Sequence, residues 1–258
     1  MTPDSRRMLL AGETWLTYGI HQKGFSAYTT GGYEEGQTEW VAALREHGWD
    51  VTHIPNHLAT EEFPWSAEDL RAYDVVVLSD IGADTLQLHP DTFVRGQRTP
   101  DRLAEIASYV EAGGGFLMVG GYMSFSGFEG KARFQGTAVE RVLPVRMLGF
   151  DDRVEAPAGV TPTVRAPEHP ALAGTPGDWP HFLGYNRLVA DGGETLLTVD
   201  DDPLLVVAEH GGGRTAAFAS DCSPHWGSPE FMAWSGYGAF WDGLLRWLSS
   251  ASGPQDRP

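Results

Sequence analysis

The chain has 258 residues, of which 41% are hydrophobic and 21% charged, a composition typical of one large globular domain or two small ones. Its formal net charge of −17 argues against nucleic-acid and membrane-surface partners, because such a surface repels phosphate backbones and anionic lipids. The single cysteine, Cys222, excludes an internal disulfide and a cysteine-rich metal site and fits a reducing, cytoplasmic compartment. The first residues hold too few apolar side chains for a signal-peptide core, and no run approaches the ~18 apolar residues of a membrane helix.

The first half of the chain alternates between strand-like and helix-like patterns. Short apolar runs that stop at Gly or at polar residues predict buried strands at 8–12, 51–55, 74–78 and 116–119. Apolar spacing and capping signals predict helices at 34–47, from 66 onward and at 99–112. Because the strand runs are continuously apolar, both sheet faces should be covered by helices. The alternation predicts βαβ units and a mostly parallel sheet.

Residues 14–33 show no clean period and are interrupted by several glycines. We therefore expect a long loop, and long loops in compact domains are often functional. As a lid over a site, this loop would bring three side chains to a substrate: His21, Lys23 and Tyr33.

The second half of the chain differs from the first in composition and pattern. Residues 145–220 are rich in Pro, Gly and acidic residues, and four short runs predict an antiparallel β extension: 160–164, 194–199, 204–209 and 214–220. A last helix is expected at 229–249, and its broad aromatic face predicts either core packing or the interface of a homo-oligomer. No repeat or linker divides the chain, so we expect a single domain at 1–250, with a disordered tail at 251–258.

Candidate functional residues follow the predicted strands, because ligands bind outside the carboxyl ends of strands in an open parallel sheet. The candidates for acid, base or nucleophile are Glu13, Asp80, Tyr122, Asp221, Cys222 and His225. Gly121 and Ser124, beside Tyr122, are candidates for contacts to substrate.

The turn after the strand at 116–119 has the strand, turn and helix context of a nucleophile elbow. The elbow position carries Tyr122, which can donate a proton or polarise a carbonyl but is a poor nucleophile with an ordinary pKa near 10. An alternative is that Tyr122 only fills space at a tight turn.

The segment 221–225 is the densest polar cluster of the chain. Cys222 and His225 lie three residues apart and suit a thiolate and imidazole pair. Alternatively, Asp221 and His225 bind a divalent metal together with Glu13 or Asp80, although no defined metal signature is present and no cofactor is expected. A third alternative is that Cys222 is simply packed, as most free cysteines are.

Eight segments resemble the bacterial family of putative glutamine amidotransferases, with class I glutamine amidotransferase-like domains. The resemblance covers about residues 8–250. The segments are GETW (12–15), GGYEEGQTEW (31–40), SDIGADTLQLHPDTF (79–93), GGGFLMVGGYMSFSGFEGKARFQGT (113–137), LPV (143–145), LGYNR (183–187), DDPLLVV (201–207) and GGGRTAAFASDCSPHWG (211–227).

The resemblance implies an α/β fold, a flavodoxin-like three-layer sandwich with a mostly parallel sheet and an antiparallel β extension, related to trehalose-utilisation-protein-like domains. Class I amidotransferases place a Cys nucleophile at the elbow and a His-Pro-Glu after a late strand. This chain has Tyr122 at the elbow and the segment 221–225 after the late strand, so it lacks the elbow thiol that attacks glutamine.

Two hypotheses follow. The first is an enzyme that acts on a small polar metabolite at the carboxyl edge of the sheet, with a carboxylate as base and with Tyr122 and His225 as acid or carbonyl polariser. The second is a non-catalytic domain, for small-molecule binding or subunit interaction, on a degenerate amidotransferase scaffold.

Overall fold

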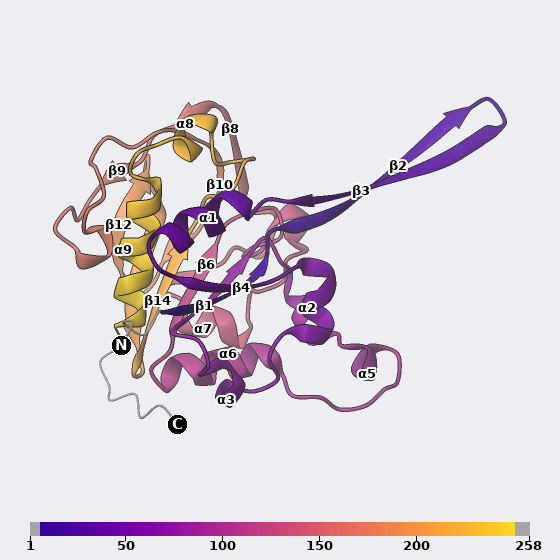
Figure 1. Ribbon diagram of the computed structural model, residues 1–258, viewed down its shortest axis with the longest axis horizontal. Helices are drawn as coiled ribbons and strands as arrows, with labels where there is room; N and C mark the ends of the chain where they lie inside the picture. Colours follow the sequence, from indigo (N-terminus) through magenta and orange to yellow (C-terminus); the bar gives the residue numbers. More distant parts are fainter. Residues whose placement is uncertain (1–5, 251–258) are drawn as a thin grey trace.

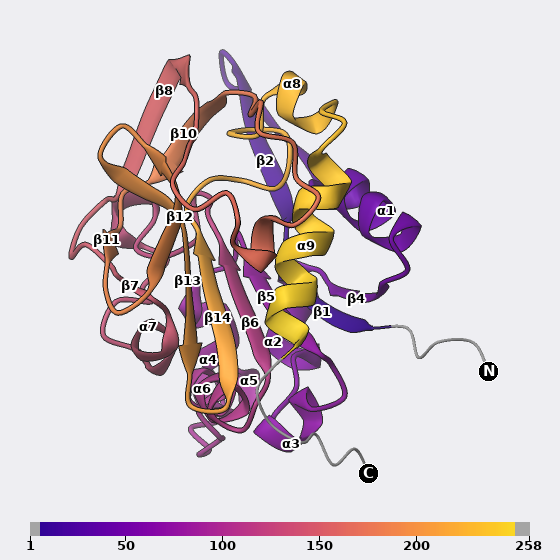
Figure 2. The ribbon, with the colours of Figure 1, turned by 90° about the vertical axis from the view of Figure 1, so that its left-hand side faces the viewer.

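The computed structural model describes residues 6–250, so the tail predicted at 251–258 lies outside the described residues. An eight-stranded sheet runs through the middle of the fold in the order β4-β1-β5-β6-β14-β13-β12-β9 (Figure 2). Its strands are β1 (Arg7–Gly12), β4 (Asp50–Ile54), β5 (Val75–Ser79), β6 (Gly115–Val119), β9 (Thr163–Val164), β12 (Glu194–Val199), β13 (Asp202–His210) and β14 (Gly213–Phe218). The strands expected in the first half of the chain are confirmed.

The sheet is parallel from β4 to β14 and antiparallel from β14 to β9. The last strand of the predicted antiparallel extension, β14, therefore belongs to the parallel part, because it pairs with β6 in parallel register. Its carboxyl end consequently lies at the same edge as those of β1, β5 and β6, as the candidate site required. Two small antiparallel ribbons complete the extension: β8 (Arg153–Val160) with β10 (Phe182–Asn186), and β7 (Val145–Arg146) with β11 (Val189–Ala190).

Helices cover the sheet on both faces, as its wholly buried strands require (Figures 1 and 2). On one face, α9 (Tyr237–Ser249) packs on β5, β6 and β14, and α1 (Thr38–Glu46) packs on β4 and α9. On the other, α2 (Asn56–Glu62) packs on β1 and β4, and α6 (Arg102–Glu111) packs on β14. The remaining helical segments are α3 (Ala67–Leu70), α4 (Ala83–Gln87), α5 (Pro90–Phe93), η1 (Phe128–Gly130), α7 (Ala138–Val142), η2 (Pro170–Leu172) and α8 (Pro229–Met232).

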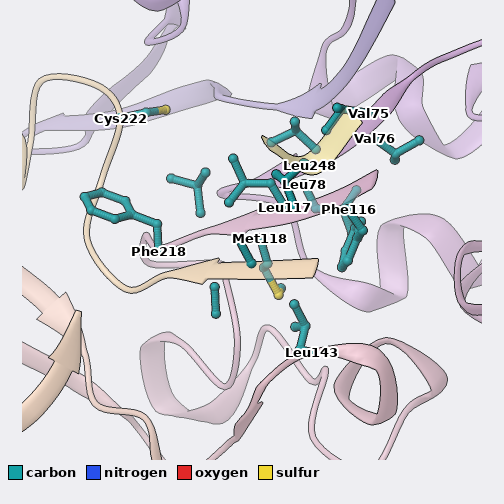
Figure 3. Packing of buried hydrophobic residues seen from close by; sticks show 14 of the residues in the cluster. Val75, Val76, Leu78, Phe116, Leu117, Met118, Leu143, Phe218, Cys222 and Leu248 are labelled. Carbon is teal, nitrogen blue, oxygen red and sulfur yellow. The ribbon is translucent and has the colours of Figure 1, made fainter. Parts of the chain in front are cut away.

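The aromatic face of the last helix lies in the core. Phe240 and Trp241 are fully buried, and the Trp241 ring lies 5.2 Å from that of Phe218 on β14. Figure 3 shows Phe218 in the same cluster as Leu117 and Met118 of β6. The helix expected at 229–249 is two helices, α8 and α9, interrupted at residues 233–236. Of the two roles predicted for these aromatic residues, the structure supports core packing.

The loop expected at 14–33 is instead a β-hairpin, and this prediction was wrong. β2 (Thr14–Lys23) pairs with β3 (Ser26–Glu35) over ten consecutive residue pairs, and the hairpin projects from the body of the molecule (Figure 1). We call residues 14–35 the arm. Leu16, Tyr18 and Ile20 recur at every second residue, which is the period of a strand, but the interspersed glycines masked this alternation.

Within residues 6–250, none of the helices has the length and apolar character needed to cross a bilayer.

Gly12 allows the close approach of β1 and β5 on which the site depends. Its φ is +118°, and a Cβ at this position would lie 1.7 Å from the carbonyl oxygen of Ser79. We predict that Gly12→Ala lowers the free energy of unfolding by about 3 kcal/mol or more, because a backbone atom cannot move aside cheaply.

The urea midpoint measures this effect. Gly177→Ala is the matched control, since a Cβ there meets nothing within 4 Å, and it should change stability by no more than about 0.5 kcal/mol. Equal midpoints for the two variants would contradict the close approach.

Candidate active site

The site begins where β1 and β5 end. Glu13 and Asp80 directly follow these adjacent strands, and both have left-handed backbones, with φ of +57° and +44°. The Glu13 amide donates to the Ser79 carbonyl oxygen at 3.0 Å, and the Glu13 carbonyl oxygen accepts from the Gly36 amide at 2.9 Å. Non-glycine residues in this conformation are costly and cluster at functional sites. The two carboxyl side chains are thus set by the backbone at the carboxyl edge of the sheet.

The Glu13 carboxyl group is buried and lies between two serine hydroxyls. Ser79 donates to Oε1 at 2.5 Å, and Ser223, from the loop after β14, lies 2.9 Å from Oε2. The Ser223 hydroxyl is also 2.9 Å from Oδ1 of Asp221, which is itself buried. A single hydroxyl therefore bridges the carboxyl groups of Glu13 and Asp221.

This bridge requires an additional proton. A serine hydroxyl has one hydrogen and can donate to only one carboxylate at a time. The second short contact is favourable only if the other carboxyl group carries a proton and donates to the serine oxygen. Burial raises the pKa of Glu13 well above its ordinary value, and the charges of Asp221 and Asp80 raise it further. The proton therefore resides on Glu13, and Ser223 donates to Asp221.

Asp80 is held by the turn that follows β6. The Met123 amide donates to Oδ1 of Asp80 at 2.6 Å, and the Asp80 amide donates to the hydroxyl of Ser124 at 3.0 Å. Burial, with the charge of Asp221, raises the pKa of Asp80 from 3.8 to about 6. The predicted substrate contact Ser124 is buried and instead positions Asp80.

Asp221 and His225 form an acidic and basic pair at the mouth of the site. His225 Nδ1 lies 3.6 Å from Asp221 Oδ2, and the His225 side chain remains 44% exposed while that of Asp221 is 5% exposed. The neighbouring Asp221 carboxylate raises the pKa of His225 above its ordinary 6.5. Hydrogen bonds thus run from the interior at Glu13 through Ser223 to Asp221, which pairs with the partly exposed imidazole.

Tyr122 packs against His225 from the turn after β6. Their ring centroids are 4.6 Å apart in an edge-to-face arrangement, and the Tyr122 hydroxyl donates to Glu155 at 2.7 Å. Glu155 also accepts from the indole of Trp226, and the Arg153 guanidinium lies 4.4 Å from the Tyr122 ring centroid. The hydrogen bond to Glu155 raises the pKa of Tyr122, so its hydroxyl is a proton donor rather than a nucleophile.

The turn after β6 is not a nucleophile elbow, so this prediction was wrong. The next helical element is the short η1, well beyond Tyr122, and Tyr122 is not among the residues of positive φ in the described part of the chain. The turn is held by Asn186, whose side chain accepts from the Gly121 amide at 3.0 Å and donates to the Gly121 carbonyl oxygen at 3.2 Å. Gly121 is buried against the side chain of Asp80, so it contributes to the shape of the site through this contact.

Cys222 is fully buried, and its Sγ lies 3.6 Å from the hydroxyl of Ser79. Burial and the neighbouring Glu13 raise the pKa of this thiol well above its ordinary value. The thiolate that a nucleophile requires is thus strongly disfavoured. Figure 3 places Cys222 on the loop after β14, at the end of the apolar cluster.

A cation site would have to use the same groups. Ligand atoms of Glu13, Asp221 and Cys222 lie within 4.8 Å of one another. Both oxygens of Glu13 already have serine partners, so a cation at this position would have to displace these hydroxyl groups and deprotonate its ligands.

The arm carries the three residues expected to contact substrate. His21 and Lys23 lie near its tip, exposed, and His21 stacks on Tyr28 at 4.7 Å. At about 3.3 Å per strand residue, His21 lies roughly 23 Å along the arm from Thr14. Neither residue joins the site of its own chain. Tyr33 lies near the base of the arm, edge-on to His57 at 5.3 Å.

The sequence analysis missed the serines that connect the carboxyl groups and the residues that hold the turn. Ser79 and Ser223 adjoin predicted candidates at the ends of predicted strands, so this position in the sequence could have identified them as site residues. Asn186 and Glu155 come from β10 and β8, far along the chain, and only the segment LGYNR (183–187) marked the former.

Two adjacent hollows border the site. A groove of about 750 Å³ lies between α1 and α8 and reaches Pro224 and His225; we call it the α1–α8 groove. A second hollow of about 470 Å³ at the base of the arm shares Glu39 and Pro224 with the groove.

Comparison with known families finds one match: the model described as "Putative glutamine amidotransferase" matches residues 7–250. A comparison with curated proteins finds no match.

Among solved structures, the chain is similar to two proteins of Salmonella typhimurium. It is 45% identical to Cytoplasmic Protein STM3548, with a TM-score of 0.90 over 95% of this chain and 98% of that one. It is 44% identical to Cytoplasmic Protein STM1381 from strain LT2, with a TM-score of 0.90 over 94% of this chain and 99% of that one. A thua-like protein of Parabacteroides merdae shares 13% identity with a TM-score of 0.55, over 99% of this chain and 95% of that one, which indicates a common fold.

The raised pKa of Asp80 makes stability depend on pH. Between the ordinary value of 3.8 and about 6, the unfolded chain releases the Asp80 proton while the folded chain retains it. The stability associated with this proton is present below pH 4 and is lost as the pH rises through 6. Relative to the wild type, Asp80→Asn should therefore gain about 3 kcal/mol between pH 3 and pH 7. Urea unfolding at both pH values measures this gain.

Asp151→Asn is a control of opposite sign. The hydrogen bond from Arg153 lowers the pKa of Asp151 to about 2, so the stability associated with ionised Asp151 is present above pH 4 and is lost as the pH falls toward 2. This variant should lose stability relative to the wild type as the pH rises from 2 to 4. A pH-independent difference for Asp80→Asn would refute the assignment.

Proposed function

The chain belongs to the putative glutamine amidotransferase family, and from this premise we propose that it is an acid–base enzyme that hydrolyses a small polar metabolite without a covalent thiol step. The observation that carries the proposal is the proximity of three carboxyl groups and an imidazole in different protonation states. Glu13 has a pKa well above its ordinary value, Asp80 has a pKa of about 6, and Asp221 pairs with a His225 of raised pKa. Perturbed and mutually coupled groups of this kind cluster at catalytic sites.

The proposed reaction uses Asp80 as base and His225 as acid. Near neutral pH, Asp80 is ionised and can take a proton from a water molecule that attacks the substrate. Asp221 favours the protonated form of His225, which can give its proton to the leaving group. Tyr122, beside His225, can donate a hydrogen bond to a developing oxyanion when it exchanges Glu155 for substrate. Asp221 positions His225 rather than reacting itself.

The charges around the site define the substrate class. Asp80, Asp221 and Glu155 surround His225, and the nearby Arg153 is engaged by Asp151 and Glu155. These carboxylates would repel an anionic substrate. We therefore propose a neutral or cationic metabolite.

The proposal departs from class I amidotransferase chemistry at the nucleophile. The sequence position expected for the elbow thiol carries Tyr122, in a turn that is not an elbow, and Cys222 is a buried thiol of raised pKa. Water is thus the nucleophile, and ordinary glutamine hydrolysis through a thioester does not follow from the family name.

Two further inferences rest on the same relationships. The order β4-β1-β5-β6-β14 of the parallel strands supports a flavodoxin-like core, in which the ends of β1 and β5 form the usual ligand crevice. The names of the two Salmonella proteins support a cytoplasmic location for this chain.

The alternative function is a non-catalytic domain for small-molecule binding or subunit interaction. The absence of an elbow thiol favours it. The connection of Glu13, Ser223, Asp221 and His225 argues against it, because a binding site does not require a series of groups that can transfer a proton.

The test is a screen of neutral and cationic metabolites for turnover by NMR, followed by variants assayed on the substrate found. We predict that Asp80→Asn and His225→Gln each lower kcat/KM by about 100-fold or more. Cys222→Ala should remain within about 3-fold of the wild type, because the thiol does not react. Loss of turnover in Cys222→Ala, with full turnover in His225→Gln, would contradict the mechanism.

The thiol can also be tested without a substrate. We predict that iodoacetamide leaves Cys222 unmodified in the folded protein at pH 8 and alkylates it in urea, because the native thiol is buried and its pKa is raised. Intact mass measures the modification. Rapid labelling of the folded protein would show a reactive thiol and contradict this interpretation.

A further inference from the structure

The arm exposes more large hydrophobic side chains than the rest of residues 6–250 together. Tyr18 is 75% exposed, Ile20 is 80% exposed and Phe25, at the tip, is fully exposed. Its two strands pair only with each other, and Figure 1 shows them leaving the body of the molecule. A two-stranded hairpin is only marginally stable in water without a surface to pack on. The arm therefore has the properties of an element that is covered by a partner.

One face of the arm is largely apolar and, beyond Glu35 at its base, without charge. The register places Leu16, Tyr18 and Ile20 of β2 on the same face as Tyr33 and Gly31 of β3. The opposite face carries His21 and Lys23 toward the tip. Between residues 15 and 33 the arm contains no carboxylate, although the whole chain has a net charge of −17.

The α1–α8 groove has complementary properties. Its apolar residues include Ala42, Ala43 and Met232, and Glu39 and Glu46 bring two carboxylates to it from the same helix, α1. The groove adjoins the hollow at the base of the arm through Glu39 and Pro224. It thus offers an apolar surface for the arm and acidic partners for Lys23.

We propose that two copies of this chain form a dimer in which the arm of each lies in the α1–α8 groove of the other. Both complementary surfaces are on one chain, so a two-fold axis satisfies both contacts at once. Because two acidic bodies repel each other, the arm, which has no carboxylate between residues 15 and 33, is the segment suited to reach the second copy. The groove reaches His225, so the arm of one copy adjoins the candidate site of the other. The proposal does not depend on the proposed reaction.

Sedimentation equilibrium of the full chain over micromolar concentrations tests the dimer. The double variant Ile20→Ser and Phe25→Ser should raise the dimer dissociation constant by at least about 10-fold, since apolar anchors dominate such contacts. Phe93→Ser is the matched control, because Phe93 is 73% exposed and lies outside the arm, and it should leave the constant unchanged. Far-UV circular dichroism checks that each variant is folded.

Charge exchange tests the groove itself. Lys23→Glu should weaken the dimer, as should the pair Glu39→Lys and Glu46→Lys, and combining all three should restore it to within about 3-fold of the wild type. Three results would overturn the proposal. The wild type could be a monomer, it could be larger than a dimer, or its dimer dissociation constant could be unchanged in the double variant Ile20→Ser and Phe25→Ser. Weakening by the arm variant without rescue by charge exchange would place the arm on another surface and would also overturn it.

Discussion

The carboxyl group of Glu13 joins three segments that leave the sheet at β1, β5 and β14. It is buried at the end of β1 and receives hydroxyl groups from Ser79 and Ser223. Ser223 continues the contact to Asp221, which pairs with His225 at the surface. An unpaired charge at the position of Glu13 would be very costly. The site therefore depends on a carboxyl group that is both hydrogen-bonded and neutral.

This constraint determines the protonation of the other groups. With the proton on Glu13, Ser223 donates to Asp221, and the negative charge of Asp221 stabilises the imidazolium of His225. The same negative charge and burial raise the pKa of Asp80 toward neutrality. The site thus places a base of moderate strength, Asp80, near an imidazole whose protonated form Asp221 favours. The backbone of Glu13 and Asp80 contributes by holding both residues in the left-handed conformation at adjacent strand ends.

Much of this arrangement could be predicted from the sequence, because parallel strands place their carboxyl ends together. The apolar run of β5 and the polar residue after it were sufficient to predict Asp80, and the same reasoning predicted Glu13, Asp221 and His225. The contact between Glu13 and Ser223 could not be predicted, since it joins residues far apart in the chain and depends on the exact loop path. Asn186 was missed because its function is to hold the turn at Gly121, which only the folded chain reveals. The arm was predicted as a loop because glycines interrupt the alternation of apolar and polar residues in its strands. A two-stranded hairpin outside the core also has no buried face, so its sequence lacks the pattern that marks a strand of the central sheet.

The most direct test of this account is a carbon-13 NMR titration that follows the side-chain carboxyl of Glu13 and the ring of His225. The account predicts that Glu13 remains protonated at pH 7 and that His225 loses its proton above its ordinary pKa of 6.5. In Ser223→Ala, which removes the connecting hydroxyl, the titrations of the two groups should become less coupled. A Glu13 that ionises near its ordinary pKa of 4.5, with a His225 that titrates at or below 6.5, would contradict the account.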